Sequence, residues 1–121
     1  MSNPDVVPMI DPSVIASLRE LDDDGGSSLL IEVIDLYVNE ASAQVAALQS
    51  ALQSGDLRAL ERTAHTLKSS SANVGALGFA ALCADIEHHG RAANATDLDE
   101  LVGRAQQQYV EVCKALAAVK G

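Results

Sequence analysis

Apolar residues recur every three or four positions through the second quarter of this chain, and this spacing restricts the possible folds more than any other feature of the sequence. Over residues 28–54 the apolar positions are Leu30, Val33, Ile34, Tyr37, Val38, Ala41, Val45, Leu48 and Leu52. Residues at such spacings share one face of an α-helix, so they predict a long amphipathic helix with Ser27 or Ser28 as its N-cap. No segment alternates with the period of two that a strand requires. The predicted fold class is all-α.

Two neighbouring helices can be placed by the residues that start and stop them. Asp11 and Pro12 are typical of an N-cap and a first helical residue, so a short helix is expected before the long one. The apolar stripe of this short helix is Val14, Ile15, Leu18 and Leu21. Gly55 is expected to end the long helix, and Asp56 to cap a third helix that lasts to about residue 73.

Two further helices and short linkers define the predicted architecture. A fourth helix is expected over residues 76–89, with Gly90 as its stop, and a fifth over residues 98–119. Because the linkers are only a few residues long, consecutive helices should be antiparallel neighbours. We therefore predict an antiparallel four-helix bundle, up-down-up-down, with a short additional N-terminal helix. This domain would span residues 11–121, after a flexible lead-in over residues 1–10.

The chain is acidic, with a formal net charge of -9 at pH 7. Nucleic acids and anionic membranes need a basic face, so the charge argues against both and favours another protein as the partner. No signal peptide or membrane-spanning stretch is evident, which predicts a cytoplasmic protein. Met1 favours an independent protein, expected to be a monomer, over a fragment of a larger one. Cys83 and Cys113 lie on apolar stripes and are expected to be free core thiols, with a disulfide as the alternative.

A histidine lies on the third predicted helix, away from the apolar face of that helix. The face that should pack inward is formed by Leu60, Ala64, Leu67, Ser71 and Val74. His65 points roughly 130° away from the centre of this face, so its imidazole should be open to solvent and to a second protein. With an ordinary pKa of about 6.5, the ring is largely neutral at cytoplasmic pH and one nitrogen can attack phosphorus.

The expected surroundings of His65 are basic on one side and flat on the other. The residues sharing its exposed patch are Arg58, Glu61, Arg62, Lys68, Ser69 and Ala72. Lys68, one turn after the histidine, could reach a phosphate on the ring, and at an exposed site that pairing is worth about 0.2 to 1 kcal/mol. As an alternative, Arg58, Glu61 and Arg62 are only solvated charges, with Glu61 and Arg58 paired along the helix.

Residues 64–76 closely resemble the motif of histidine-containing phosphotransfer (HPt) domains, which reads His-x-Leu-Lys-Gly-x-(Ser or Ala) and then Gly-Ala. The matching residues here are His65, Leu67, Lys68, Ser69, Ser71, Gly75 and Ala76. The resemblance implies a phosphohistidine at His65, on the ε nitrogen, and exchange with the aspartate of a response-regulator receiver domain or with a hybrid histidine kinase. The receiver would supply Mg²⁺ and most of the catalysis.

The other residues around His65 have expected roles as well. Lys68 would stabilise the phosphate, and Ser71 and Gly75 would be structural. Residues expected to bind the partner are Arg58, Glu61, Arg62, Ser69 and Ala72. The protein would be a phosphoryl carrier in a phosphorelay and not an enzyme, with no cofactor, no metal and no nucleotide site.

One departure from the family pattern is Ser69, where the motif usually has glycine and hence open space beside the ring. Serine is small and could donate a hydrogen bond to a phosphate oxygen, or it could bond a carbonyl of its own helix one turn back. We expect slightly altered kinetics from this substitution and no loss of function.

Three other functions can be weighed against the carrier. A metal-binding bundle is suggested by the spacing of Asp85 and His88, but it needs a second such pair and two more buried carboxylates, which the sequence does not supply. An interaction module that never carries phosphate would have no need of His65 and Lys68. An ATP-dependent kinase would need a glycine-rich phosphate loop, and none is present.

Overall fold

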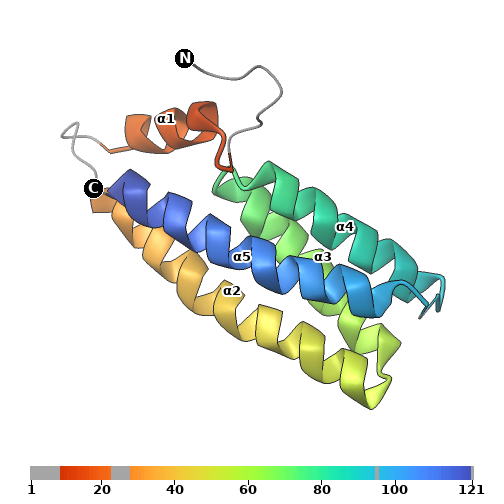
Figure 1. Cartoon of the computed structure of the whole chain (residues 1–121). Helices are drawn as coiled ribbons and strands as arrows, with labels where there is room; N and C mark the ends of the chain where they lie inside the picture. The colour runs from red at the N-terminus through yellow and green to blue at the C-terminus, as the bar shows by residue number, and fades with distance from the viewer. Residues whose placement is uncertain (1–8, 23–27, 95, 121) are drawn as a thin grey trace.

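The computed structural model describes residues 9–22, 28–94 and 96–120, and within these ranges the chain is helical with no strand (Figure 1). The helices are α1 (Pro12–Glu20), α2 (Ser28–Ser54), α3 (Leu57–Asn73), α4 (Leu77–Arg91) and α5 (Leu98–Lys120). The predicted fold class is confirmed. None of these helices is long and apolar enough to cross a membrane.

The four long helices form a ring in which each one contacts two neighbours, in the order α2, α3, α4, α5 (Figure 1). Lys120 at the end of α5 forms an ion pair with Asp35 near the start of α2. Further along α2, Gln49 accepts a hydrogen bond from Gln106 of α5 at 3.3 Å. The contacts proceed forward along α2 and backward along α5, so these two helices are antiparallel. The short helix α1 lies across one end of this bundle (Figure 1).

The predicted helix starts are confirmed at two N-caps. The Asp11 carboxylate accepts from the Ser13 amide at 2.9 Å, and the Asp56 carboxylate accepts from the Ala59 amide at 3.0 Å. At the start of α2 it is the Asp22 carboxylate that accepts from the Leu29 amide, at 3.1 Å. Ser28 is the first helical residue there, and Ser27 lies outside the described residues.

The predicted end of α4 is wrong, because Gly90 lies inside the helix and α4 continues to Arg91. Gly90 is buried where α4 crosses α3, and a Cβ at this position would lie 3.1 Å from Leu60 Cδ2 and 3.4 Å from the Leu57 carbonyl oxygen. This glycine therefore allows a close approach of two helices, which sequence reasoning mistook for a helix stop.

Most residues of the predicted stripes lie in the core or pack against it. Leu30, Ile34, Leu48, Leu60 and Leu116 are almost completely inaccessible. Leu21, which was assigned to the stripe of the first helix, is 65% exposed because α1 ends at Glu20 and Leu21 is its C-cap. From the expected lead-in, Met9 and Ile10 pack against the core, whereas residues 1–8 lie outside the described residues.

Gly75 joins α3 to α4 and also anchors the start of α1. Its φ of +85° lies in the left-handed region, which glycine adopts without a steric penalty. Its carbonyl accepts from the Asp11 amide at 2.8 Å, and a Cβ here would lie 3.1 Å from Val14 Cβ. The structural role expected for Gly75 thus has two causes, the turn and the contact with α1.

Ser71 has a buried partner on the neighbouring helix, which explains a hydroxyl on the inward face of α3. Its Oγ and the Tyr37 hydroxyl are 2.7 Å apart, and both side chains are buried. Burial raises the pKa of Tyr37 to about 12, so this hydroxyl stays protonated. The hydrogen bond fixes α3 against α2 one and a half turns beyond His65.

Ser71→Ala is expected to lower the free energy of unfolding by about 1 to 3 kcal/mol, because it leaves the Tyr37 hydroxyl buried without a partner. Urea denaturation followed by circular dichroism measures this loss. Adding Tyr37→Phe removes the stranded hydroxyl, so the double variant should be more stable than Ser71→Ala alone. A Ser71→Ala variant as stable as the parent would contradict the role of this hydrogen bond.

Candidate functional site

The predicted orientation of His65 is confirmed, since its side chain lies on the outer face of α3 and is 60% exposed. The predicted inward face of the same helix is buried, including Leu60, Ala64 and Leu67. One ring edge is thus open to solvent while the helix beneath it is held firmly by the core.

The ring is held by Glu87 of α4, whose side chain is only 8% exposed. His65 Nδ1 lies 2.7 Å from Glu87 Oε2. An ionised carboxylate can only accept hydrogen bonds, so Nδ1 must carry the proton of the neutral ring. The other ring nitrogen, Nε2, then keeps its lone pair and lies on the far side of the ring from Glu87.

The same carboxylate binds two cations. Lys68 Nζ donates to Glu87 Oε1 at 2.6 Å, and Arg91 Nη2 donates to Glu87 Oε2 at 3.1 Å. Arg91 Nε also donates to Glu61 Oε1 at 2.9 Å. These contacts form a charged cluster of His65, Lys68, Glu87, Arg91 and Glu61 that joins α3 to α4.

The cluster keeps Glu87 ionised. The hydrogen bond from Lys68 is the largest influence on the pKa of Glu87 and lowers it. Burial opposes this effect, and the smaller contribution of the His65 hydrogen bond adds to the lowering, so the pKa lies below its ordinary value. A carboxylate buried among aliphatic side chains would otherwise be costly. At neutral pH the residue is therefore a permanent negative charge beside the imidazole.

The other residues predicted around His65 are placed as follows. Arg58, Arg62 and Ser69 are exposed, and Ala72 is half-buried. Glu61 pairs with Arg91 on the next helix and not with Arg58 along its own, which corrects the alternative considered above. An open cavity of about 340 Å³ lies beside the ring, lined by Glu61, Arg62, His65, Thr66, Glu87 and Arg91.

Sequence reasoning missed the roles of Glu87 and Arg91. Glu87 stands four residues after Cys83 and seven after Ala80, both buried, so a carboxylate at stripe spacing was the available signal that it has partners. The role of Arg91 was missed because the fourth helix was predicted to stop at Gly90, which placed Arg91 outside it.

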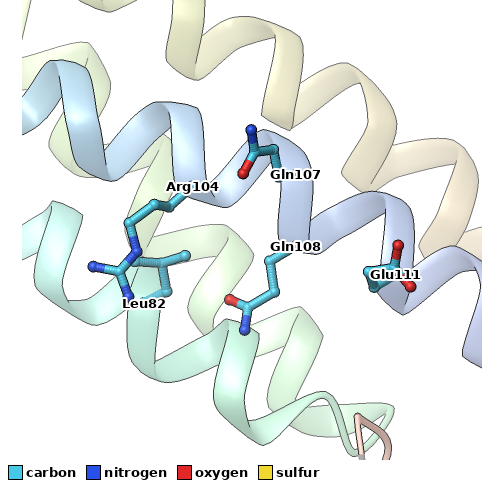
Figure 2. A pocket seen from close by; sticks show the side chains of 5 residues that line it. All are labelled: Leu82, Arg104, Gln107, Gln108 and Glu111. Atoms are coloured by element: carbon cyan, nitrogen blue, oxygen red, sulfur yellow. The ribbon is translucent and has the colours of Figure 1, made fainter.

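A second hollow lies between α4 and α5 and contains no residue of α3. It is lined by Leu82, Arg104, Gln107, Gln108 and Glu111 (Figure 2). With no histidine, cysteine or reactive carboxylate pair in it, this hollow offers no chemistry comparable to that at His65.

The alternative of a metal-binding bundle finds no support in the described part of the chain. Across residues 9–22, 28–94 and 96–120, no three His, Cys, Asp or Glu side chains are grouped to hold a metal ion. Asp85 and His88 are both exposed on α4. His89 is half-buried and uses Nδ1 to bond the Asp85 carbonyl, at 2.9 Å. Cys83 and Cys113 are free thiols.

Comparisons with protein families, with individual proteins and with solved structures all lead to the same family. A family described as Hpt domain matches residues 32–120. Multistep phosphorelay regulator 1 of Schizosaccharomyces pombe is 35% identical over 82 residues, which are 68% of this chain and 28% of that protein. The chain therefore spans less than a third of the length of this relative.

Two solved structures are similar to this one over most of their length. Histidine-containing phosphotransfer protein B (HptB) from Pseudomonas aeruginosa PAO1 is 28% identical, with a TM-score of 0.84 over 93% of this chain and 95% of that one. Histidine-containing phosphotransfer protein MtHPt2 from Medicago truncatula is 23% identical, with a TM-score of 0.81 over 91% of this chain and 76% of that one. The second likeness concerns the fold alone.

Proposed function

Since this chain belongs to the Hpt domain family, which serves histidine phosphotransfer in two-component phosphorelays, we propose that His65 is the residue that accepts and donates the phosphoryl group. The observation that carries this proposal is the pairing of an exposed ring with a buried carboxylate. Glu87 fixes the proton on Nδ1 and leaves Nε2 as the nucleophile, facing outward.

The reaction needs little chemistry from this chain. The Nε2 lone pair attacks phosphorus in the aspartyl phosphate of a receiver domain, the bond between phosphorus and the aspartate oxygen breaks, and the aspartate leaves as a carboxylate. Nε2 has no proton to lose, so the product ring is a cation. Glu87 accepts the Nδ1–H hydrogen bond and stabilises that positive charge. Return of the phosphoryl group reverses these steps.

The partners proposed for this chain are response-regulator receiver domains and hybrid histidine kinases. The receiver would bring the Mg²⁺ ion and most of the catalysis, and this chain would act as a monomeric, cytoplasmic carrier with no nucleotide site. Partner binding is assigned to the surface around the ring, with Arg58, Glu61, Arg62, Ser69 and Ala72. The acidic charge of the chain supports a protein partner over nucleic acid.

Transfer from a phosphorylated receiver domain tests this function directly. The purified chain should acquire a phosphoryl group that is labile in acid and stable in base, as a phosphoramidate bond to histidine is. A screen against the receiver domains of the source organism would identify the partner. A folded chain that no phosphorylated receiver labels would overturn the proposal.

Ser69→Gly is expected to change the transfer rate by less than about ten-fold, because at this exposed position water can replace the hydroxyl as a donor to the phosphoryl group nearly as well. The Thr66 and Ser70 hydroxyls donate to carbonyls of their own helix, whereas the Ser69 side chain is exposed and its hydroxyl makes no hydrogen bond within the described residues. Its hydroxyl is thus available to a phosphoryl oxygen. Phosphoryl transfer reactions that are quenched at successive times give the transfer rates of both proteins.

The control for this comparison is Ser50→Gly, at an exposed position of α2, because glycine inside any helix costs about 1 kcal/mol of stability. Rates should be compared at a temperature where all three proteins are folded. A hundredfold gain for Ser69→Gly would show that serine obstructs the site and that the proposed surface is misjudged.

A further inference from the structure

Three cations lie close to His65, and the structure separates them by what they already bind. Lys68 is committed to Glu87 at 2.6 Å. Arg91 is committed to Glu61 at 2.9 Å and to Glu87 at 3.1 Å. The Arg62 guanidinium forms no hydrogen bond and no ion pair with any described residue, and the side chain is exposed.

Arg62 also lies on the appropriate side of the ring. With 100° per residue, Arg62 and Lys68 stand about 60° to either side of His65 around the axis of α3, one turn before it and one turn after it. Lys68 is on the side of Glu87, toward which Nδ1 points. Nε2, on the opposite edge of the ring, is therefore turned away from Lys68 and toward the side of Arg62.

The cavity of about 340 Å³ beside the ring supports the same assignment. Arg62, His65 and Thr66 line it, and Lys68 does not. Two carboxylates line it as well, but Glu61 and Glu87 both bind Arg91, which offsets their charge. The cavity has room for a tetrahedral anion.

We infer that Arg62, and not Lys68, is the side chain that binds the phosphoryl oxygens when His65 is phosphorylated. A guanidinium presents paired N–H donors in a plane, a geometry that matches two phosphoryl oxygens better than an ammonium does. Lys68 then acts through Glu87, holding the carboxylate that orients the ring. This inference rests on the proposed phosphorylation of His65.

The test uses phosphoramidate, a small phosphoryl donor, so that no docking partner is involved. The initial rate of labelling of the full chain is measured for the parent, Arg62→Gln and Arg104→Gln. Arg104 is a matched control, because it is an exposed arginine on the far hollow between α4 and α5 (Figure 2). Arg62→Gln should label roughly two- to five-fold more slowly, and Arg104→Gln like the parent.

A second readout reports on the bound phosphoryl group itself. Titration followed by ³¹P NMR gives the pKa of the phosphoryl group on the labelled protein. A neighbouring guanidinium favours the dianion and lowers this pKa, so Arg62→Gln should raise it by about 0.2 to 0.7. Arg62→Lys keeps the charge and should recover part of the effect. A purely structural role of Arg62 would leave this pKa unchanged.

The outcomes separate this inference from the proposed function. If His65 is labelled and Arg62→Gln behaves like Arg104→Gln in both measurements, the role of Arg62 is overturned and that of His65 stands. If the parent is not labelled, or if His65→Gln is labelled equally, the proposed function fails and the inference fails with it.

Discussion

His65→Gln is expected to abolish transfer of the phosphoryl group from a phosphorylated receiver, with labelling reduced to background. The ring nitrogen is the only proposed acceptor, and glutamine offers no nucleophilic nitrogen of comparable basicity. The side chain is 60% exposed and lies outside the hydrophobic core, so the fold should be unaffected. Labelling assayed with a phosphorylated receiver measures the loss.

Two controls make this result interpretable. Circular dichroism should show the parent's helical content and melting temperature for His65→Gln. His88→Gln, at an exposed histidine on α4 outside the charged cluster, should be labelled like the parent. Unchanged labelling of a folded His65→Gln variant would move the site elsewhere.

Glu87→Leu is expected to slow transfer by about 10- to 100-fold, the effect typical of a displaced reacting group. Without the carboxylate, Nδ1 loses its acceptor, so the proton can move to Nε2 and block the nucleophile. The ring also becomes free to rotate. Transfer rates and the ¹H–¹⁵N spectrum of His65, which identifies the protonated nitrogen, should change together.

Glu87→Gln is the matched variant for this prediction. Its side-chain oxygen can still accept from Nδ1, so the tautomer should persist and the rate should lie between those of the parent and Glu87→Leu. Lys68 and Arg91 are 36% and 63% exposed, so water can solvate both once their partner is gone. A Glu87→Leu variant with the parent's rate and spectrum would contradict the positioning role.

The fold was predictable because periodicity reports which residues share a helix face. The inward face of α3 and the outward position of His65 followed from that rule alone. Contacts between helices do not follow from it. Glu87 is 22 residues from His65 in sequence, and only the packing of α4 on α3 brings the two together. The sequence therefore indicated the proposed nucleophile but not the carboxylate that bonds its ring.

The error at the end of α4 has a physical origin. Glycine is permissive, so a glycine near a predicted boundary is consistent with a turn and equally with a helix interior that needs room. Gly55 takes the first role, with a φ of +75°, and Gly90 the second. Only knowledge of what faces the residue across the helix pair distinguishes them, and that knowledge was needed to find Arg91.

At Gly90 a hydrogen atom occupies the place where every other residue type would insert a carbon between α4 and Leu60. The distance between α3 and α4 at this crossing influences how closely the Glu87 carboxylate approaches the imidazole of His65. Steric clearance on the buried side of α4 thus contributes to the placement of the carboxylate that bonds a ring on the outer surface. Selection acting on the charged cluster would therefore be felt at a residue that contributes no side chain to it.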